Sequence, residues 1–126
     1  MLKKGILGLL YRRLALTTKH SIQGVDSALR TQEAFRCEIL ASLILLPLAL
    51  YVATDYLQLI LLVGAVLMVL IVELLNTGIE VVVDRIGLEL HELSGRAKDV
   101  GSAAVLISLM LFLAVWGVII NENYFS

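Results

Sequence analysis

Residues 66–84 read V-L-M-V-L-I-V-E-L-L-N-T-G-I-E-V-V-V-D, a hydrophobic segment that contains four polar side chains. Glu73, Asn76, Glu80 and Asp84 follow one another at spacings of three, four and four residues, which places them on one face of a helix. The residues around them are mostly Leu, Ile and Val. Such a helix belongs in lipid, where an ionisable side chain is costly and therefore indicates a functional site.

The composition of the whole chain indicates a membrane protein. Of its 126 residues, 60% are hydrophobic and 17% are charged, and the mean hydropathy is +0.94. These values are too apolar for an ordinary soluble domain. The single cysteine, Cys37, cannot form an internal disulfide, so cysteine usage leaves the compartment open. We expect one membrane domain over residues 1–126, helical throughout.

Three apolar stretches predict three transmembrane helices, because about 20 residues of helix cross a bilayer core. They cover about residues 35–54, 56–83 and 100–120, and the second includes Glu73 and Glu80. The stretch before them, residues 1–34, has apolar residues at helical spacing among basic ones and lacks the features of a cleavable signal. It predicts an amphipathic helix on the membrane surface, with a partly disordered leader as the alternative.

The basic residues predict the orientation of the spans. All ten occur in two regions, seven up to residue 36 and three between residues 85 and 98. The turn near Asp55 and the tail after Ile120 have none. The positive-inside rule therefore places the N-terminus and the loop at residues 84–99 in the cytoplasm, and the C-terminus outside.

The carboxylates of the polar face can bind a cation and move a proton. Mg²⁺ prefers oxygen ligands and keeps water and phosphate oxygens around it, so Glu80, nearer the cytoplasm, fits a metal-bound nucleotide. Glu73, deeper, fits proton abstraction from a substrate that arrives through lipid. Lys98 can hold phosphate as a point charge, and Asp99 can cap the third span or orient Lys98. An ordinary solvated loop is the alternative for this last pair.

No general nucleotide-binding motif accompanies these residues. The sequence contains neither G-x-x-x-x-G-K-[ST] nor G-x-G-x-x-G, and it lacks the protein-kinase signatures and a metal-type cluster of Cys and His. The residues alone therefore predict a polar site at the cytoplasmic end of the second span, without identifying ATP.

Three longer motifs resemble a known family. They are V-E-L-L-N-T-G-I-E-V-V-V-D-R-I-G at residues 72–87, H-E-L-S-G-R-A-K-D-V-G-S-A-A-V-L at residues 91–106 and A-F-R-C-E at residues 34–38. Together they resemble the prokaryotic diacylglycerol kinases, especially the Gram-negative branch, over nearly the whole chain. The resemblance implies an all-α, homotrimeric enzyme of the inner membrane. It would transfer the ATP γ-phosphate to diacylglycerol and give phosphatidic acid.

The resemblance also implies roles for single residues. Glu73 would be the general base on the lipid hydroxyl, Glu80 would hold the nucleotide's Mg²⁺, and Asn76 would lie between them in the site. Lys98 and Asp99 would contact ATP. Further ATP contacts are implied for Arg13, His20, Gln32, Glu80, Glu89, Leu90 and His91. Contacts with the lipid substrate are implied for Arg13, Phe35, Arg36, Glu38, Glu73 and Ser102.

One position departs from the family pattern. The family usually has a glutamate three residues before the Phe of A-F-R-C-E, where it shares the metal, but this chain has Gln32 followed by Glu33. A neutral amide is a weaker Mg²⁺ ligand than a carboxylate. Either Glu33 takes over as ligand, or the metal depends on Glu80 and phosphate oxygens. His20 similarly stands where the family often has tyrosine.

Two other functions compete with this interpretation. An undecaprenol kinase of the same family would use the same face and the same chemistry. A small proton or ion transporter subunit would also place carboxylates in the membrane, but it requires polar groups through the full membrane depth. The third span offers only Ser108 in its middle, and the outer half of the second has no charge. A three-helix protomer is also thin, so we expect a closed site to need a neighbouring subunit.

Overall fold

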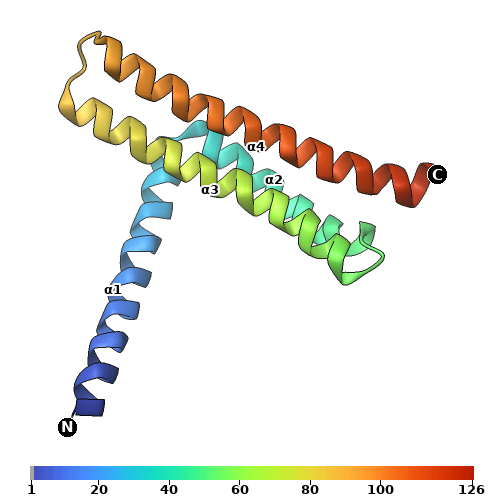
Figure 1. Cartoon of the computed structure of the whole chain (residues 1–126), viewed down its shortest axis with the longest axis horizontal. Helices are drawn as coiled ribbons and strands as arrows, with labels where there is room; N and C mark the ends of the chain where they lie inside the picture. Colours follow the sequence, from blue (N-terminus) through green and yellow to red (C-terminus); the bar gives the residue numbers. More distant parts are fainter. Residues whose placement is uncertain (1) are drawn as a thin grey trace.

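The computed structural model describes residues 2–126, with side chains from Gly5 onward, and this part of the chain is all-α (Figure 1). The helices are α1 (Leu2–Thr31), α2 (Glu33–Val52), α3 (Tyr56–Ile86) and α4 (Glu92–Phe125). α2, α3 and α4 are each long and apolar enough to cross a membrane. The predicted fold class, three spans after an N-terminal helix, is confirmed. The side chains of Lys3 and Lys4, counted above among the basic residues, lie outside the described residues.

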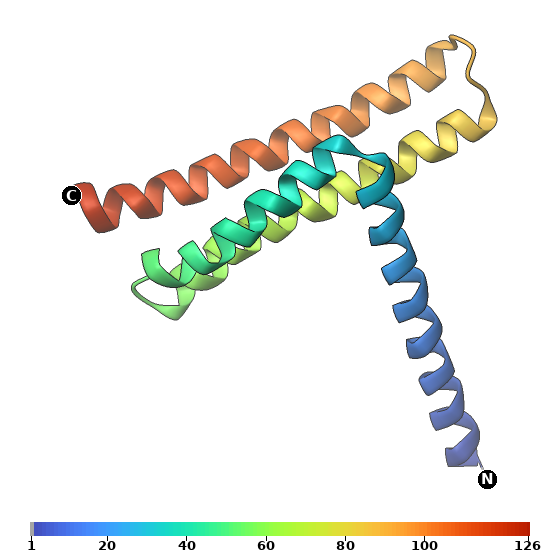
Figure 2. The same ribbon diagram turned by 180° about the vertical axis from the view of Figure 1, so that it is seen from behind.

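The helices α2, α3 and α4 run side by side and alternate in direction, and they form the bundle. α1 leaves this bundle at a steep angle as an arm (Figures 1 and 2). α3 packs most extensively against α4 and to a smaller extent against α2. The bundle therefore has two ends, one at the α2–α3 turn and one at the α3–α4 loop.

The hydrophobic core lies toward the α2–α3 end. It consists of Ala49, Val52, Leu62, Ala65, Val66, Trp116 and Ile119. The Trp116 indole N–H donates to the carbonyl oxygen of Leu62 at 3.1 Å, which satisfies a donor that would be costly to bury unpaired. Because this half is apolar, the polar face of α3 is confined to the other half.

The α2–α3 turn is held to the end of α4 by amide side chains. Asp55 begins α3 by accepting from the Gln58 backbone N–H at 2.8 Å, the usual role of an N-cap aspartate. The Asn123 amide donates to the Val52 carbonyl at 2.9 Å and to Gln58 Oε1 at 2.9 Å. The three spans are therefore fixed together at this end.

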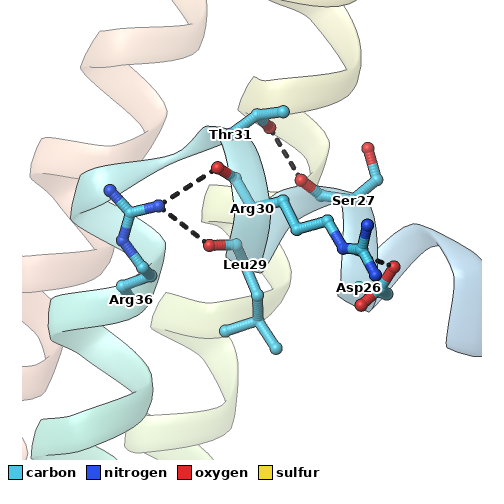
Figure 3. A network of polar contacts seen from close by, with 6 residues as sticks. All are labelled: Asp26, Ser27, Leu29, Arg30, Thr31 and Arg36. Atoms are coloured by element: carbon cyan, nitrogen blue, oxygen red, sulfur yellow. Dashed lines mark hydrogen bonds and ion pairs between the residues drawn. The ribbon is translucent and has the colours of Figure 1, made fainter.

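A single non-helical residue, Gln32, separates α1 from α2, two positions before the predicted boundary at residue 34. Arg36 Nη1 donates to the carbonyl oxygens of Leu29 at 3.0 Å and Arg30 at 3.2 Å (Figure 3). The last carbonyls of a helix lack partners within it and carry partial negative charge, so a guanidinium stabilises them. Arg36 thus closes the end of α1 from the first turn of α2.

The connection predicted at residues 84–99 is non-helical only at residues 87–91. The Gly87 N–H still donates to the Val83 carbonyl, and His91 Nδ1 accepts from the Leu93 N–H at 3.1 Å and caps α4. Leaving the hydrocarbon does not by itself end a helix, because the backbone bonds remain favourable in water. The 34 residues of α4 therefore extend past a bilayer core, which needs about 20.

Among the described side chains of α1, only Ala28 is buried. Apolar residues such as Ile6, Leu10, Leu14 and Ile22 are exposed along the arm. α1 contacts the bundle only where its end meets α2 and α3, so its apolar side chains lack a partner within one chain.

Candidate active site

Four polar side chains of α3 form a gradient of exposure. Glu73 is 6% exposed, Asn76 and Glu80 are half-buried, and Asp84 is exposed near the α3–α4 end. α3 is continuous through all four positions, so they share one face of the helix. This face connects a buried carboxyl to the end of the bundle.

Glu73 has an acidic neighbour on α2. The carboxyl groups of Glu38 and Glu73 lie next to each other, and Glu38 Oε2 is buried with no hydrogen-bond partner among the described residues. Glu38 also lines an apolar cavity of about 120 Å³ with Ser42 and Phe112. One carboxyl of this pair, that of Glu38, therefore borders an apolar cavity inside the bundle.

Lys98 pairs with Asp84 across α3 and α4, at 2.8 Å between Nζ and Oδ1. It precedes the uncharged run that begins at Val100. The hydrogen bond and charge of Asp84 raise the pKa of the Lys98 amine, and the charge of Glu80 adds to the effect. Lys98 is therefore a fixed cation at the end of the polar face.

The sequence left two roles open for Asp99, and neither matches its position. α4 begins at Glu92 with His91 as its cap, so Asp99 lies two turns inside the helix and cannot cap it. The carboxylate that holds Lys98 is Asp84. Asp84 was visible in the sequence as the last member of the polar face, but which helix its partner would come from was not.

The α3–α4 loop borders a cavity of about 390 Å³ that is open to the outside. Glu89, Leu90 and His91 line it from the loop, with Val83 and Ala97 from the two helices. Its volume is in the range of small-molecule sites. These three loop residues, which the resemblance implies as nucleotide contacts, thus face a cavity at the same end of the bundle as Lys98.

Comparison with known proteins identifies the family of this chain. The sequence profile described as "Prokaryotic diacylglycerol kinase" matches residues 19–120, which is well over half of the chain. This chain belongs to the prokaryotic diacylglycerol kinase family. The predicted family is confirmed, and the match includes α2, α3 and most of α4.

The alignments of this chain with relatives in the diacylglycerol kinase family cover almost the full length of each relative. The diacylglycerol kinase of Haemophilus influenzae is 47% identical over 113 residues, 86% of this chain and 96% of its own. That of Escherichia coli is 43% identical over 114 residues, 90% of this chain and 93% of its own. That of Pseudomonas aeruginosa is 39% identical over 117 residues, 93% of this chain and 94% of its own.

Not all the residues implied by membership of this kinase family come together in one chain. Arg13 and His20 are exposed on the α1 arm, away from the bundle (Figure 2). Gln32 is half-buried at the α1–α2 break, and Glu33 is exposed in the first turn of α2. The arm therefore carries its two candidates away from Glu80.

The candidates for lipid contact divide into outward-facing and structural residues. Ser102 is exposed on α4. Phe35 is 1% exposed, because it packs inside the protein, and the Arg36 guanidinium is engaged by the carbonyls of α1. Two other candidates, Glu38 and Glu73, lie next to each other on α2 and α3.

A magnesium ion fits this face only as a nucleotide-bridged ion. The described residues contain no group of three or more His, Cys, Asp or Glu side chains able to hold a metal alone. Mg²⁺ in kinases is bound by one or two carboxylates together with phosphate oxygens and water. Glu80, half-buried and beside Asn76, offers one such carboxylate on this face.

Proposed function

We propose that this chain carries out phosphoryl transfer along the seam between α3 and α4, with the lipid hydroxyl at Glu73 and the nucleotide phosphates near Glu80 and Lys98. As a member of its family it is an ATP-dependent diacylglycerol kinase. The observation that carries the assignment of the site is the gradient from buried Glu73 to exposed Asp84. A lipid hydroxyl and a water-soluble nucleotide have to meet at such a boundary.

Helix length supports the depth of the two substrates. Tyr51, Tyr56 and Tyr124 are exposed at the α2–α3 end, as in the aromatic belts of membrane interfaces. A core of about 30 Å takes about 20 residues of helix, so the other interface falls near Asn76. Glu73 then lies about one turn inside the hydrocarbon, and the nucleotide side of the face lies outside it.

The charge distribution supports a cytoplasmic α3–α4 end. Arg85, Arg96 and Lys98 flank that loop, whereas Asp55 and Glu122 are the only charges of the opposite end. Positive charge favours the cytoplasmic side, where ATP is available. The protein would lie in the inner membrane with its C-terminus outside.

The proposed chemistry follows from these positions. The Glu73 carboxylate takes the proton of the diacylglycerol hydroxyl as that oxygen attacks the γ-phosphorus. The bond to the β–γ bridging oxygen breaks, and ADP leaves with phosphatidic acid as the other product. The Lys98 ammonium neutralises phosphate charge, and Asp99 and the loop residues contact the nucleotide. Glu80, with Gln32 or Glu33, would hold Mg²⁺, which would supply further charge neutralisation when bound.

A homotrimer would complete this site. Arg13 and His20 are implied nucleotide contacts but stand on an arm that points away from their own bundle (Figure 2). The exposed apolar residues of α1 suit a helix lying on the cytoplasmic membrane surface beside neighbouring subunits. We therefore include trimer formation and shared sites in the proposal.

The test is an assay with γ-labelled ATP in mixed micelles, with diacylglycerol and undecaprenol offered in parallel. We expect labelled phosphatidic acid. Glu73→Gln should lower kcat by about 10²–10⁴-fold, the usual contribution of a general base, with ATP binding retained. Glu122→Gln, at the α2–α3 end of the bundle and far from the polar face, is the matched control and should keep full activity.

Two results would change the proposal. Labelled undecaprenyl phosphate in place of phosphatidic acid would reassign the acceptor. Full activity of Glu73→Gln would remove Glu73 as the base and leave Glu38 as the nearest alternative carboxyl.

A further inference from the structure

Gly101 of α4 lies against the polar face of α3. It is buried, and a Cβ added to it would overlap Oδ1 of Asn76 and approach Asn76 Cγ to 3.3 Å. The next nearest atom is Cδ1 of Ile79, at 3.6 Å. The missing side chain of Gly101 is therefore what leaves room for the Asn76 amide.

This requirement is local to the site. An added Cβ would meet no atom within 4 Å at Gly64 and Gly78 of α3, or at Gly95 and Gly117 of α4. Those glycines do not serve close packing within one chain. The close contact at Gly101 is therefore with side chains of α3, first of all the Asn76 amide of the polar face.

The contact also accounts for a buried oxygen. Asn76 Oδ1 has no hydrogen-bond partner among the described residues. The Cα–H bond of Gly101 that a side chain would replace points at this oxygen, an arrangement that recurs at helix–helix contacts and is weakly attractive. The opposite end of the amide, Nδ2, lies 3.5 Å from Glu80 Oε1. Turning the amide over would place its oxygen against a carboxylate, so Gly101 and Glu80 select the same orientation.

Gly101 is also close to Lys98, three residues earlier on α4, which is held by Asp84. Asn76, Glu80 and Asp84 follow one face of α3, so Glu80 lies between the Asn76–Gly101 contact and the Asp84–Lys98 ion pair. The separation of the helices at Gly101 therefore sets where the amide and the ammonium stand relative to the Glu80 carboxylate.

We propose that Gly101 is a positioning residue for phosphoryl transfer: the bare backbone at this position holds the Asn76 amide in the orientation that directs Glu80. This inference rests on the proposed function of the polar face. It concerns a residue that touches neither substrate and acts through Asn76.

The test compares Gly101→Ala with Gly117→Ala, which lies on the same helix and gains the same helix propensity. Gly101→Ala should lower kcat by about a hundredfold, as expected when a site is misplaced by about 1 Å, with KM for diacylglycerol unchanged. Gly117→Ala should keep the wild-type kcat and KM. Equal activity of the two variants would overturn the proposal.

A second measurement separates positioning from general packing. The Tm of each glycine variant is measured in detergent micelles, in the wild-type background and in Asn76→Ala, which removes the overlapped atoms. Gly101→Ala should lower the Tm relative to Gly117→Ala only when Asn76 is present, because coupled residues are non-additive. A Tm loss that persists in full in Asn76→Ala would mean that Gly101 packs against something else, and would overturn the proposal even if kcat falls.

The Tm comparison needs no activity, so it also applies if Gly101→Ala is inactive. If the wild-type chain failed to phosphorylate diacylglycerol, the proposed function would fail while the Gly101–Asn76 coupling could still be measured. The two failures are therefore distinguishable.

Discussion

At the scale of single residues, the ion pair of Asp84 and Lys98 joins the nucleotide ends of the two site helices. The two side chains are 48% and 44% exposed, and an exposed ion pair adds little to folding stability. Its effect lies in where it holds the ammonium. Glu80 also attracts Lys98, so without Asp84 the ammonium would move toward the candidate metal ligand.

Asp84→Asn should therefore raise KM for ATP severalfold, because Lys98 would pair with Glu80 and be less available to bind phosphate. The Tm should stay nearly unchanged. Steady-state kinetics at varied ATP would measure the KM. Asp26→Asn breaks an exposed ion pair with Arg30 on α1 and serves as the matched control. An unchanged KM in Asp84→Asn would mean that Lys98 finds its position without Asp84.

A substitution at Gln32 can test whether the absence of the family's usual glutamate at this position limits the Mg²⁺ affinity. It is half-buried at the α1–α2 break, and a carboxylate is a stronger Mg²⁺ ligand than an amide. Gln32→Glu should lower the Mg²⁺ concentration for half-maximal activity. Glu33→Ala is measured in parallel: no change in Gln32→Glu together with a severe loss in Glu33→Ala would assign the ligand to Glu33.

At the scale of elements, hydropathy predicted the spans but not where the helices end. Uncharged runs are sufficient to locate α2, α3 and α4, since each must satisfy its backbone within lipid. Their ends depend on caps that charge patterns do not reveal. His91, expected as a loop residue or nucleotide contact, is the N-cap of α4. Arg36, expected at the lipid, donates hydrogen bonds to the last carbonyls of α1 from the first turn of α2.

The candidate site shows the same division. Glu73, Asn76 and Glu80 could be grouped from spacing because they belong to one helix of known period. The contact of Glu38 with Glu73 depends on how α2 is rotated against α3. A single sequence contains no measure of that rotation, nor of the register that brings Lys98 to α3.

Arg36 offers a test of the α1–α2 junction. Arg36→Ala removes both bonds to the last carbonyls of α1 (Figure 3), and unsatisfied helix ends fray. We expect faster trypsin cleavage after Arg30, measured by mass spectrometry in micelles. Arg12→Ala, which removes an exposed bond to Gly8 within α1, should leave that rate unchanged. Equal rates in both variants would show that the junction does not need the cap.

At the scale of the whole molecule, the arm and the bundle carry different parts of one proposed site. α1, which includes Arg13 and His20, extends away from the bundle (Figure 2), while Glu73 and Glu80 belong to α3 within it. The exposed apolar residues of α1 would be covered by the membrane surface or by another subunit. If another subunit covers them, a subunit's arm can act in trans.

Mixing two inactive variants tests that prediction. Glu73→Gln has an intact arm, and Arg13→Ala has an intact bundle, so a mixed trimer with shared sites would combine an intact arm with an intact Glu73. We expect labelled phosphatidic acid to form after the two purified variants are co-reconstituted from a dissociating detergent, and none from either alone. Glu73→Gln mixed with Glu80→Gln is the control, because both changes lie on α3 of the same bundle. Recovery in the control but not in the test pair would place the site between bundles and leave the arm as a membrane anchor.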